Sequence, residues 1–89
     1  MVGGETVLIR VAEEGRATQL AAELAVYANA EVRRYEGGWE VALSGAKTDR
    51  LVAIALEAVQ RSLDGDPSST AKVLLDGREY RMHANGNEG

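Results

Sequence analysis

The sequence predicts a small α+β domain in which two helices cover one face of an antiparallel sheet. Three observations lead to this prediction. Short runs rich in β-branched residues alternate apolar and polar side chains, as strands do. Two longer stretches, rich in alanine and leucine, repeat their apolar residues at helical spacing. Two glycine-containing turn signals, Gly37-Gly38 and Asp76-Gly77, each separate a pair of strand-like runs.

The first two elements are a strand and a helix. Residues 5–11 form the predicted strand, with Val7, Ile9 and Val11 on one face. The period of two is then lost, and apolar residues recur every three or four positions. Asn29 is the expected end of this helix, because asparagine tolerates the left-handed conformation found there. The apolar stripe of the helix consists of Ala17, Leu20, Ala21, Leu24 and Ala28.

Residues 30–36 and 39–44 are predicted to form a hairpin, but its register stays open. A two-residue loop at Gly37-Gly38 would pair Glu36 with Trp39. A three-residue loop from Glu36 to Gly38 would instead pair Tyr35 with Trp39 and gain an aromatic contact across the strands. The sequence does not decide between the two, and a bulge that lets the strand switch faces fits it as well.

A second helix and a second hairpin complete the chain. The helix is predicted from Thr48 or Asp49 to Asp64, because a hydroxyl at the N-cap and a carboxylate in the first turn both favour a helix start. In the hairpin, an Asp76-Gly77 turn pairs Leu75 with Arg78, and by the same register Val73 with Tyr80.

The resulting order is β-α-β-β-α-β with an additional C-terminal strand. This order predicts a ferredoxin-like sandwich, with both helices packed on one face of an antiparallel sheet. A chain of 89 residues has room for one core. We therefore expect a single α+β domain over residues 1–84 and a frayed C-terminal tail over residues 85–89.

The chain contains no cysteine. Disulfides, thiolate metal sites and cysteine nucleophiles are therefore excluded, and a small domain without disulfides is typical of a reducing compartment. The first residues do not show the basic stretch and apolar run of a signal peptide. No apolar run approaches the ~20 residues that span a bilayer. These features predict a cytoplasmic protein that does not enter a membrane.

Few residues could support catalysis. His83 is the only histidine, and a lone histidine near a chain end is typical of a solvated surface residue. Asp64 and Asp66 flank a glycine, but the other oxygen ligands of a calcium loop do not follow them. Helix capping and turn formation explain both aspartates. We therefore expect no enzymatic activity, no bound metal and no cofactor.

The connection "SGAKTDR" before the second helix offers the best anchor for an anion. Gly45, Lys47 and Thr48 stand at the expected helix N-terminus. Backbone N–H groups at such a position can hold an anion, here with help from Lys47. A plain connection between strand and helix explains the same three residues.

The sheet face that the helices leave uncovered is the expected site of interaction. It should mix apolar, acidic and basic side chains, as surfaces that bind another protein or a second copy of the same chain do. We predict a non-enzymatic interaction or regulatory module that self-associates or docks on a larger protein. The predicted contact residues are Arg10, Tyr35, Trp39 and Arg81.

A net charge of −4 argues against a nucleic-acid partner, because lysines and arginines that neutralise phosphates supply most of that affinity. Sheets of this topology that bind RNA also display two or three stacking aromatic residues. Here the only candidates are Tyr35 and Trp39.

The alternative function is small-molecule sensing. The order of elements resembles in outline that of ACT-type regulatory domains. The resemblance implies a ferredoxin-like fold and a ligand bound at a subunit interface, which in that family is an amino acid. It covers topology alone and carries no ligand-binding residue over to this sequence.

Overall fold

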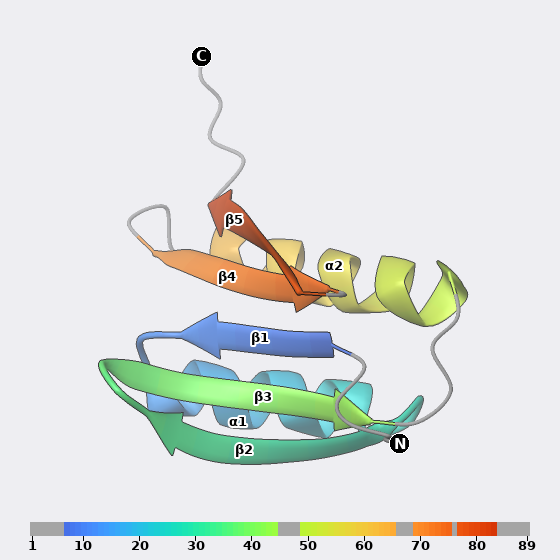
Figure 1. Ribbon diagram of the computed structural model, residues 1–89, viewed down its shortest axis with the longest axis horizontal. Coiled ribbons are helices and arrows are strands. Elements are labelled where there is room, and N and C mark those ends of the chain that lie inside the picture. Colours follow the sequence, from blue (N-terminus) through green and yellow to red (C-terminus); the bar gives the residue numbers. More distant parts are fainter. Residues whose placement is uncertain (1–6, 45–48, 66–68, 76, 84–89) are drawn as a thin grey trace.

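The structure is a computed structural model that describes residues 7–44, 49–65, 69–75 and 77–83. These residues form five strands and two helices, in an α+β arrangement (Figure 1). The elements are β1 (Val7–Val11), α1 (Glu14–Leu24), β2 (Asn29–Tyr35), β3 (Gly38–Ser44), α2 (Asp49–Asp64), β4 (Thr70–Leu75) and β5 (Arg78–His83). The predicted tail at residues 85–89 lies outside the described residues.

The strands form one sheet in the order β2-β3-β1-β4-β5, and every neighbouring pair is antiparallel. Figure 1 shows both helices behind this sheet, with α1 behind β1, β2 and β3 and α2 behind β4 and β5. The prediction that both helices cover one face is therefore confirmed. No helix within the described ranges is long and apolar enough to cross a membrane.

The core lies between the sheet and the two helices. Val7, Ile9 and Val11 point into it and are at most 3% exposed, as their alternation predicted. Leu20 and Leu24 of α1 and Val59 and Leu63 of α2 close the core from the other side, and all four are buried. The opposite face of the sheet is not covered by either helix and is called the open face below.

The first helix is shorter than predicted. It ends at Leu24, with the backbone N–H of Ala25 donating to the carbonyl of Ala21. The prediction that Asn29 ends the helix is wrong, because Asn29 is already the first residue of β2 and pairs with Ser44. The second helix begins at Asp49 and ends at Asp64, as predicted.

Arg16 ties the start of α1 to the end of α2. Its guanidinium donates hydrogen bonds to the backbone carbonyl and the hydroxyl of Ser62 and to the hydroxyl of Ser69. Its side chain is only 12% exposed, so these bonds satisfy a cation that is mostly removed from water. Arg16 therefore fixes the two helices relative to each other over the sheet.

Neither register considered for the first hairpin is correct. The loop consists of Glu36 and Gly37, so that Tyr35 pairs with Gly38 and Arg34 with Trp39. Gly37 has φ +87°, which glycine adopts without strain. In the second hairpin Leu75 pairs with Arg78, and Val73 pairs with Tyr80. The prediction for that hairpin is confirmed.

Gly38 has a different role from Gly37. It is a strand residue, and a Cβ atom there would lie 2.5 Å from the carbonyl oxygen of Val11. Real Cβ atoms do not approach backbone oxygen so closely, so any other residue would push β3 away from β1. The close approach of these two central strands therefore requires glycine at this position.

We expect Gly38→Ala to lower the free energy of unfolding by about 1–3 kcal/mol, because the added methyl group overpacks the contact with Val11. Gly15→Ala is the matched control. Gly15 is helical, and a Cβ atom added there would have no neighbour within 4 Å, so alanine should stabilise the protein by up to about 1 kcal/mol. Urea unfolding followed by the fluorescence of Trp39 measures both, and equal stabilities of the two variants would contradict the assignment.

Candidate interaction face

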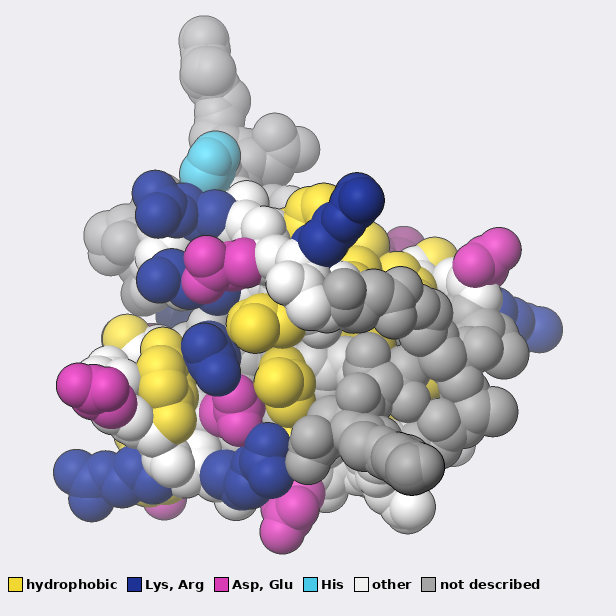
Figure 2. All heavy atoms as spheres, in the orientation of Figure 1, with side chains coloured by type: hydrophobic (Ala, Val, Ile, Leu, Met, Phe, Trp, Pro, Cys, Tyr) yellow, Lys and Arg dark blue, Asp and Glu magenta, His cyan; other side chains and the backbone are white. Residues whose placement is uncertain are grey.

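The open face carries a row of charged side chains that crosses the whole sheet. Each strand contributes one residue, and the register places these residues side by side. Figure 2 shows this face, with Lys and Arg side chains distributed over the sheet and apolar side chains among them. We call this set the charged row; in the order of the strands it consists of Arg33, Glu40, Arg10, Lys72 and Arg81.

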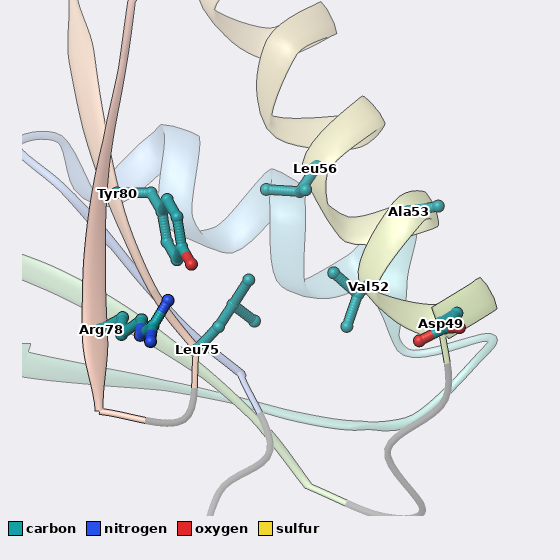
Figure 3. A pocket seen from close by; sticks show the side chains of 7 residues that line it. All are labelled: Asp49, Val52, Ala53, Leu56, Leu75, Arg78 and Tyr80. Carbon is teal, nitrogen blue, oxygen red and sulfur yellow. The ribbon is translucent and has the colours of Figure 1, made fainter.

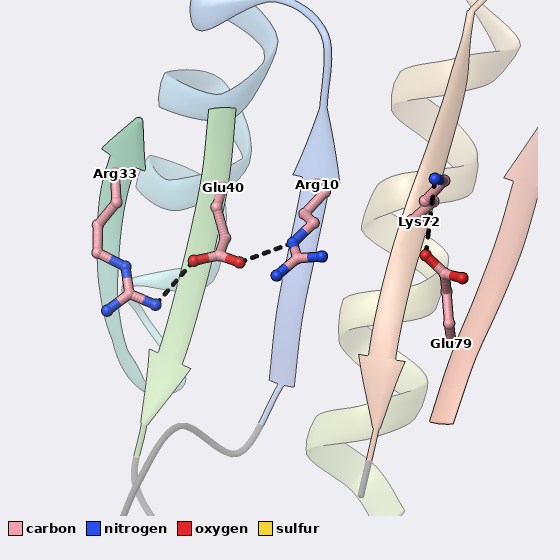
Figure 4. Close-up of polar contacts among 5 residues, drawn as sticks. All are labelled: Arg10, Arg33, Glu40, Lys72 and Glu79. Carbon is pink, nitrogen blue, oxygen red and sulfur yellow. Dashed lines mark hydrogen bonds and ion pairs between the residues drawn. The ribbon is translucent and has the colours of Figure 1, made fainter. Parts of the chain in front are cut away.

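Glu40 is the buried member of the charged row. Arg10 Nε donates a 2.8 Å hydrogen bond to Glu40 Oε2, and Arg33 Nη2 donates one of the same length to Glu40 Oε1 (Figure 4). Each carboxylate oxygen therefore has its own guanidinium. Glu40 is only 6% exposed, and it is the one buried charged residue among those the structure describes.

The environment of Glu40 keeps it ionised. Burial alone would raise the pKa of the Glu40 carboxyl, because it disfavours the charged form. The hydrogen bonds and positive charges of Arg10 and Arg33 act in the opposite direction and outweigh burial. The pKa of Glu40 therefore lies below its ordinary value of 4.5.

Arg10 also contacts the aromatic ring of Tyr35. The guanidinium carbon of Arg10 lies 4.8 Å from the centroid of the Tyr35 ring, in a cation–π contact. Tyr35 reaches Arg10 because its cross-strand partner, Gly38, has no side chain in the way. A Cβ atom on Gly38 would lie 3.3 Å from Cε1 of Tyr35. Gly38 thus serves both the packing of the central strands and the placement of Tyr35.

A second row, with an apolar centre, runs beside the charged row. We call it the apolar row; its residues, in the order of the strands, are Glu31, Ala42, Leu8, Leu74 and Glu79. Leu8 and Leu74 are half-buried, and the two terminal glutamates are exposed. One ion pair joins the two rows, between Lys72 Nζ and Glu79 Oε2 at 3.7 Å (Figure 4). Both side chains are exposed, so this pair contributes little to stability.

Three of the four predicted contact residues lie on the open face: Arg10, Tyr35 and Arg81. Trp39 does not, and its inclusion has to be corrected. The loop at Glu36-Gly37 places Trp39 on the helix-covered face, where it packs against the core. Arg34 is its partner there, with the guanidinium carbon 5.6 Å from the ring centroid.

Sequence reasoning did not name Arg33, Glu40 or Lys72 among the contact residues of this face. Arg10 and Glu40 are 30 residues apart, and only the pairing of β1 with β3 brings them together. Lys72 was expected to point outward by alternation alone, but its position in a row with Arg10 follows from the pairing of β1 with β4. No local sequence signal carries this information.

The remaining sequence predictions concern an anion anchor, His83 and metal binding. The anion anchor at Gly45, Lys47 and Thr48 lies outside the described residues. His83 is exposed at the end of β5, and its carbonyl accepts a hydrogen bond from the amide of Gln60. Among the residues described, no three His, Cys, Asp or Glu side chains gather in a group that could hold a metal ion.

No protein-family model matches the chain, and comparisons with curated proteins and with solved structures find no significant match. What the chain does must therefore be inferred from its own residues.

We expect Glu40→Gln to destabilise the protein by about 1–2 kcal/mol at pH 7. This is less than the roughly 3–5 kcal/mol typical of breaking a fully buried pair, because both arginines reach solvent. The pKa of Glu40 is lowered in the folded state, so its contribution is complete above the unfolded-state value of 4.5 and is lost as the pH falls through the folded-state pKa.

The stability difference between the wild-type protein and Glu40→Gln should therefore be constant above about pH 5.5 and shrink toward acid pH. Urea unfolding at several pH values measures this difference. Glu23→Gln is the control, since the exposed pair of Glu23 with Arg61 on the helix side of the sheet should contribute less than about 0.5 kcal/mol to stability. A difference that grew on acidification would contradict the role given to Glu40.

Proposed function

We propose that the chain is a small, non-enzymatic interaction module of ferredoxin-like topology that self-associates through its open face. The strand order supports the topology. Helix α1 joins β1 to β2, and β3 lies between these two strands. Helix α2 likewise joins β3 to β4 across β1. Two such split βαβ units make up a ferredoxin-like sandwich, and β5 is then an additional strand at the β4 edge.

The main support for self-association is that the charges at the ends of the two rows are complementary. The charged row presents Arg33 and Arg81 at its two ends. The apolar row presents Glu31 and Glu79 on the same two strands. Acidic and basic ends thus stand next to each other on each edge of the open face, and apolar side chains occupy the middle of the apolar row.

The pattern fits a dimer in which the open faces of two copies meet. Its two-fold axis lies midway between the two rows and runs perpendicular to the strands. Such an axis places the charged row of each copy over the apolar row of the other copy. Glu31 then faces Arg33 of the second copy, and Glu79 faces Arg81. Symmetry makes each of these contacts twice, which gives opposite charges at all four corners. In the centre, Leu8 and Leu74 of each copy face the aliphatic stems of Arg10 and Lys72 of the other copy.

A second copy of the chain fits this face better than a nucleic acid does. The buried carboxylate of Glu40 lies within the row of cations, where it repels phosphate. Tyr35 is the one aromatic side chain that the described strands bring to this face, and Arg10 already covers its ring. An RNA-binding sheet needs several free aromatic surfaces and a larger excess of positive charge.

Sedimentation equilibrium of the full chain tests the proposal. We expect a dimer, and we expect Arg81→Glu to raise its dissociation constant at least about tenfold, because like charges then face each other twice. The double variant Glu79→Arg with Arg81→Glu exchanges the two charges and should restore much of the affinity. A structural defect caused by Arg81→Glu would not be repaired by the second substitution.

Arg50→Glu is the control. Arg50 is exposed on α2, on the far side of the sheet, so the same charge reversal there should leave the dimer unchanged. A monomer at millimolar concentration would contradict self-association. A dimer that responds equally to Arg50→Glu and Arg81→Glu would contradict the open face as its interface.

A further inference from the structure

A pocket of about 660 Å³ lies between α2 and the hairpin formed by β4 and β5. It is on the helix side of the sheet, away from the open face. Its volume falls within the ~300–1,000 Å³ of small-molecule sites. The residues that line it are Asp49, Val52, Ala53, Leu56, Leu75, Arg78 and Tyr80 (Figure 3).

The middle of the pocket is apolar. Val52 and Leu56 of α2 and Leu75 of β4 are half-buried, so each keeps part of its surface in contact with solvent. These three side chains are packed against the core behind them. They form a supported apolar surface on which the body of a ligand can lie.

One end of the pocket carries two hydrogen-bond donors. Arg78 and Tyr80 alternate onto the helix side of β5, and Figure 3 shows both side chains reaching from this strand toward the space in front of α2. Within the described part of the chain, neither the guanidinium nor the phenol hydroxyl has a hydrogen-bond or ion-pair partner. Tyr80 is also 44% exposed, which is high for so large an aromatic side chain.

Asp49 stands at the other end of the pocket, with Val52 and Leu75 between it and Arg78 in Figure 3. It belongs to the first turn of α2, where its carboxylate is favoured by the positive end of the helix dipole. An anion would be repelled by Asp49 and attracted by Arg78. The charges therefore give a bound ligand one orientation.

We propose that this pocket binds a small carboxylate with an apolar body. The guanidinium of Arg78 pairs with the carboxylate, the hydroxyl of Tyr80 donates a hydrogen bond to it, and the body lies on Val52, Leu56 and Leu75. Charge-assisted hydrogen bonds of this kind supply specificity where the apolar surface supplies most of the contact area. The site does not depend on self-association through the open face, because it uses the other side of the sheet.

Titration of the full chain with octanoate, followed by ¹H–¹⁵N NMR, tests the inference. We expect shift changes centred on Val52, Leu75, Arg78 and Tyr80, and a dissociation constant of about 1 mM or tighter. Octanol, which has the same chain length but no charge, should bind about tenfold more weakly, because it lacks the charged hydrogen bonds to Arg78.

Two variants sharpen the test. Arg78→Gln should weaken octanoate binding about tenfold, whereas Arg81→Gln, the same loss of charge on the opposite face of the same strand, should leave it unchanged. Ala53→Phe should also weaken binding, because it fills the mouth of the pocket from an exposed position of α2 that does not support the core. The NMR spectrum of each free variant shows whether it is folded.

Absence of binding, equal binding of octanoate and octanol, shift changes centred on the open face, or full affinity in folded Arg78→Gln would each overturn the inference. Self-association is read separately by sedimentation. Arg81→Glu distinguishes self-association from ligand binding, because this variant should form a weaker dimer and still bind octanoate. Loss of one property without the other therefore identifies which proposal has failed.

Discussion

The layout of the open face depends on one carboxylate held between two guanidiniums. Sheet register brings four cations into a single row, and like charges on neighbouring strands repel each other. Glu40 separates two of them, Arg10 and Arg33, and binds both at 2.8 Å. Without an acidic residue at this position, the row would carry only positive charge. With it, the arginines have fixed positions, and Arg10 can also lie against Tyr35.

Two adjacent glycines, Gly37 and Gly38, make this arrangement possible. Gly37 supplies the positive φ angle of the turn, and Gly38 allows β3 to approach the carbonyl of Val11 on β1. Because the turn uses Glu36 and Gly37, Tyr35 points to the open face and Trp39 to the core. A shift of one residue would exchange the two faces for the whole strand. The local choice of turn therefore decides which side chains a partner meets.

Much of the fold could be predicted from the sequence, since the order of elements, helix α2 and the hairpin around Gly77 are all encoded locally. The hairpin around Gly37 could not, because either glycine can occupy the turn and the deciding contact is with Val11, far away along the chain. Alternation alone placed Arg10 and Arg81 on the open face. The link from Arg10 to Glu40 needs the pairing of two distant strands, and the pocket at Arg78 needs the packing of α2 against β5.

The most direct test is the pKa of Glu40 itself, measured in the wild-type protein from the ¹³C chemical shift of its carboxyl group as a function of pH. We predict a value below the ordinary 4.5, because the charges of Arg10 and Arg33 outweigh the cost of burial. A value at or above 4.5 would mean that burial dominates and that the two arginines do not hold the carboxylate. The charged row would then lack the interaction that organises it.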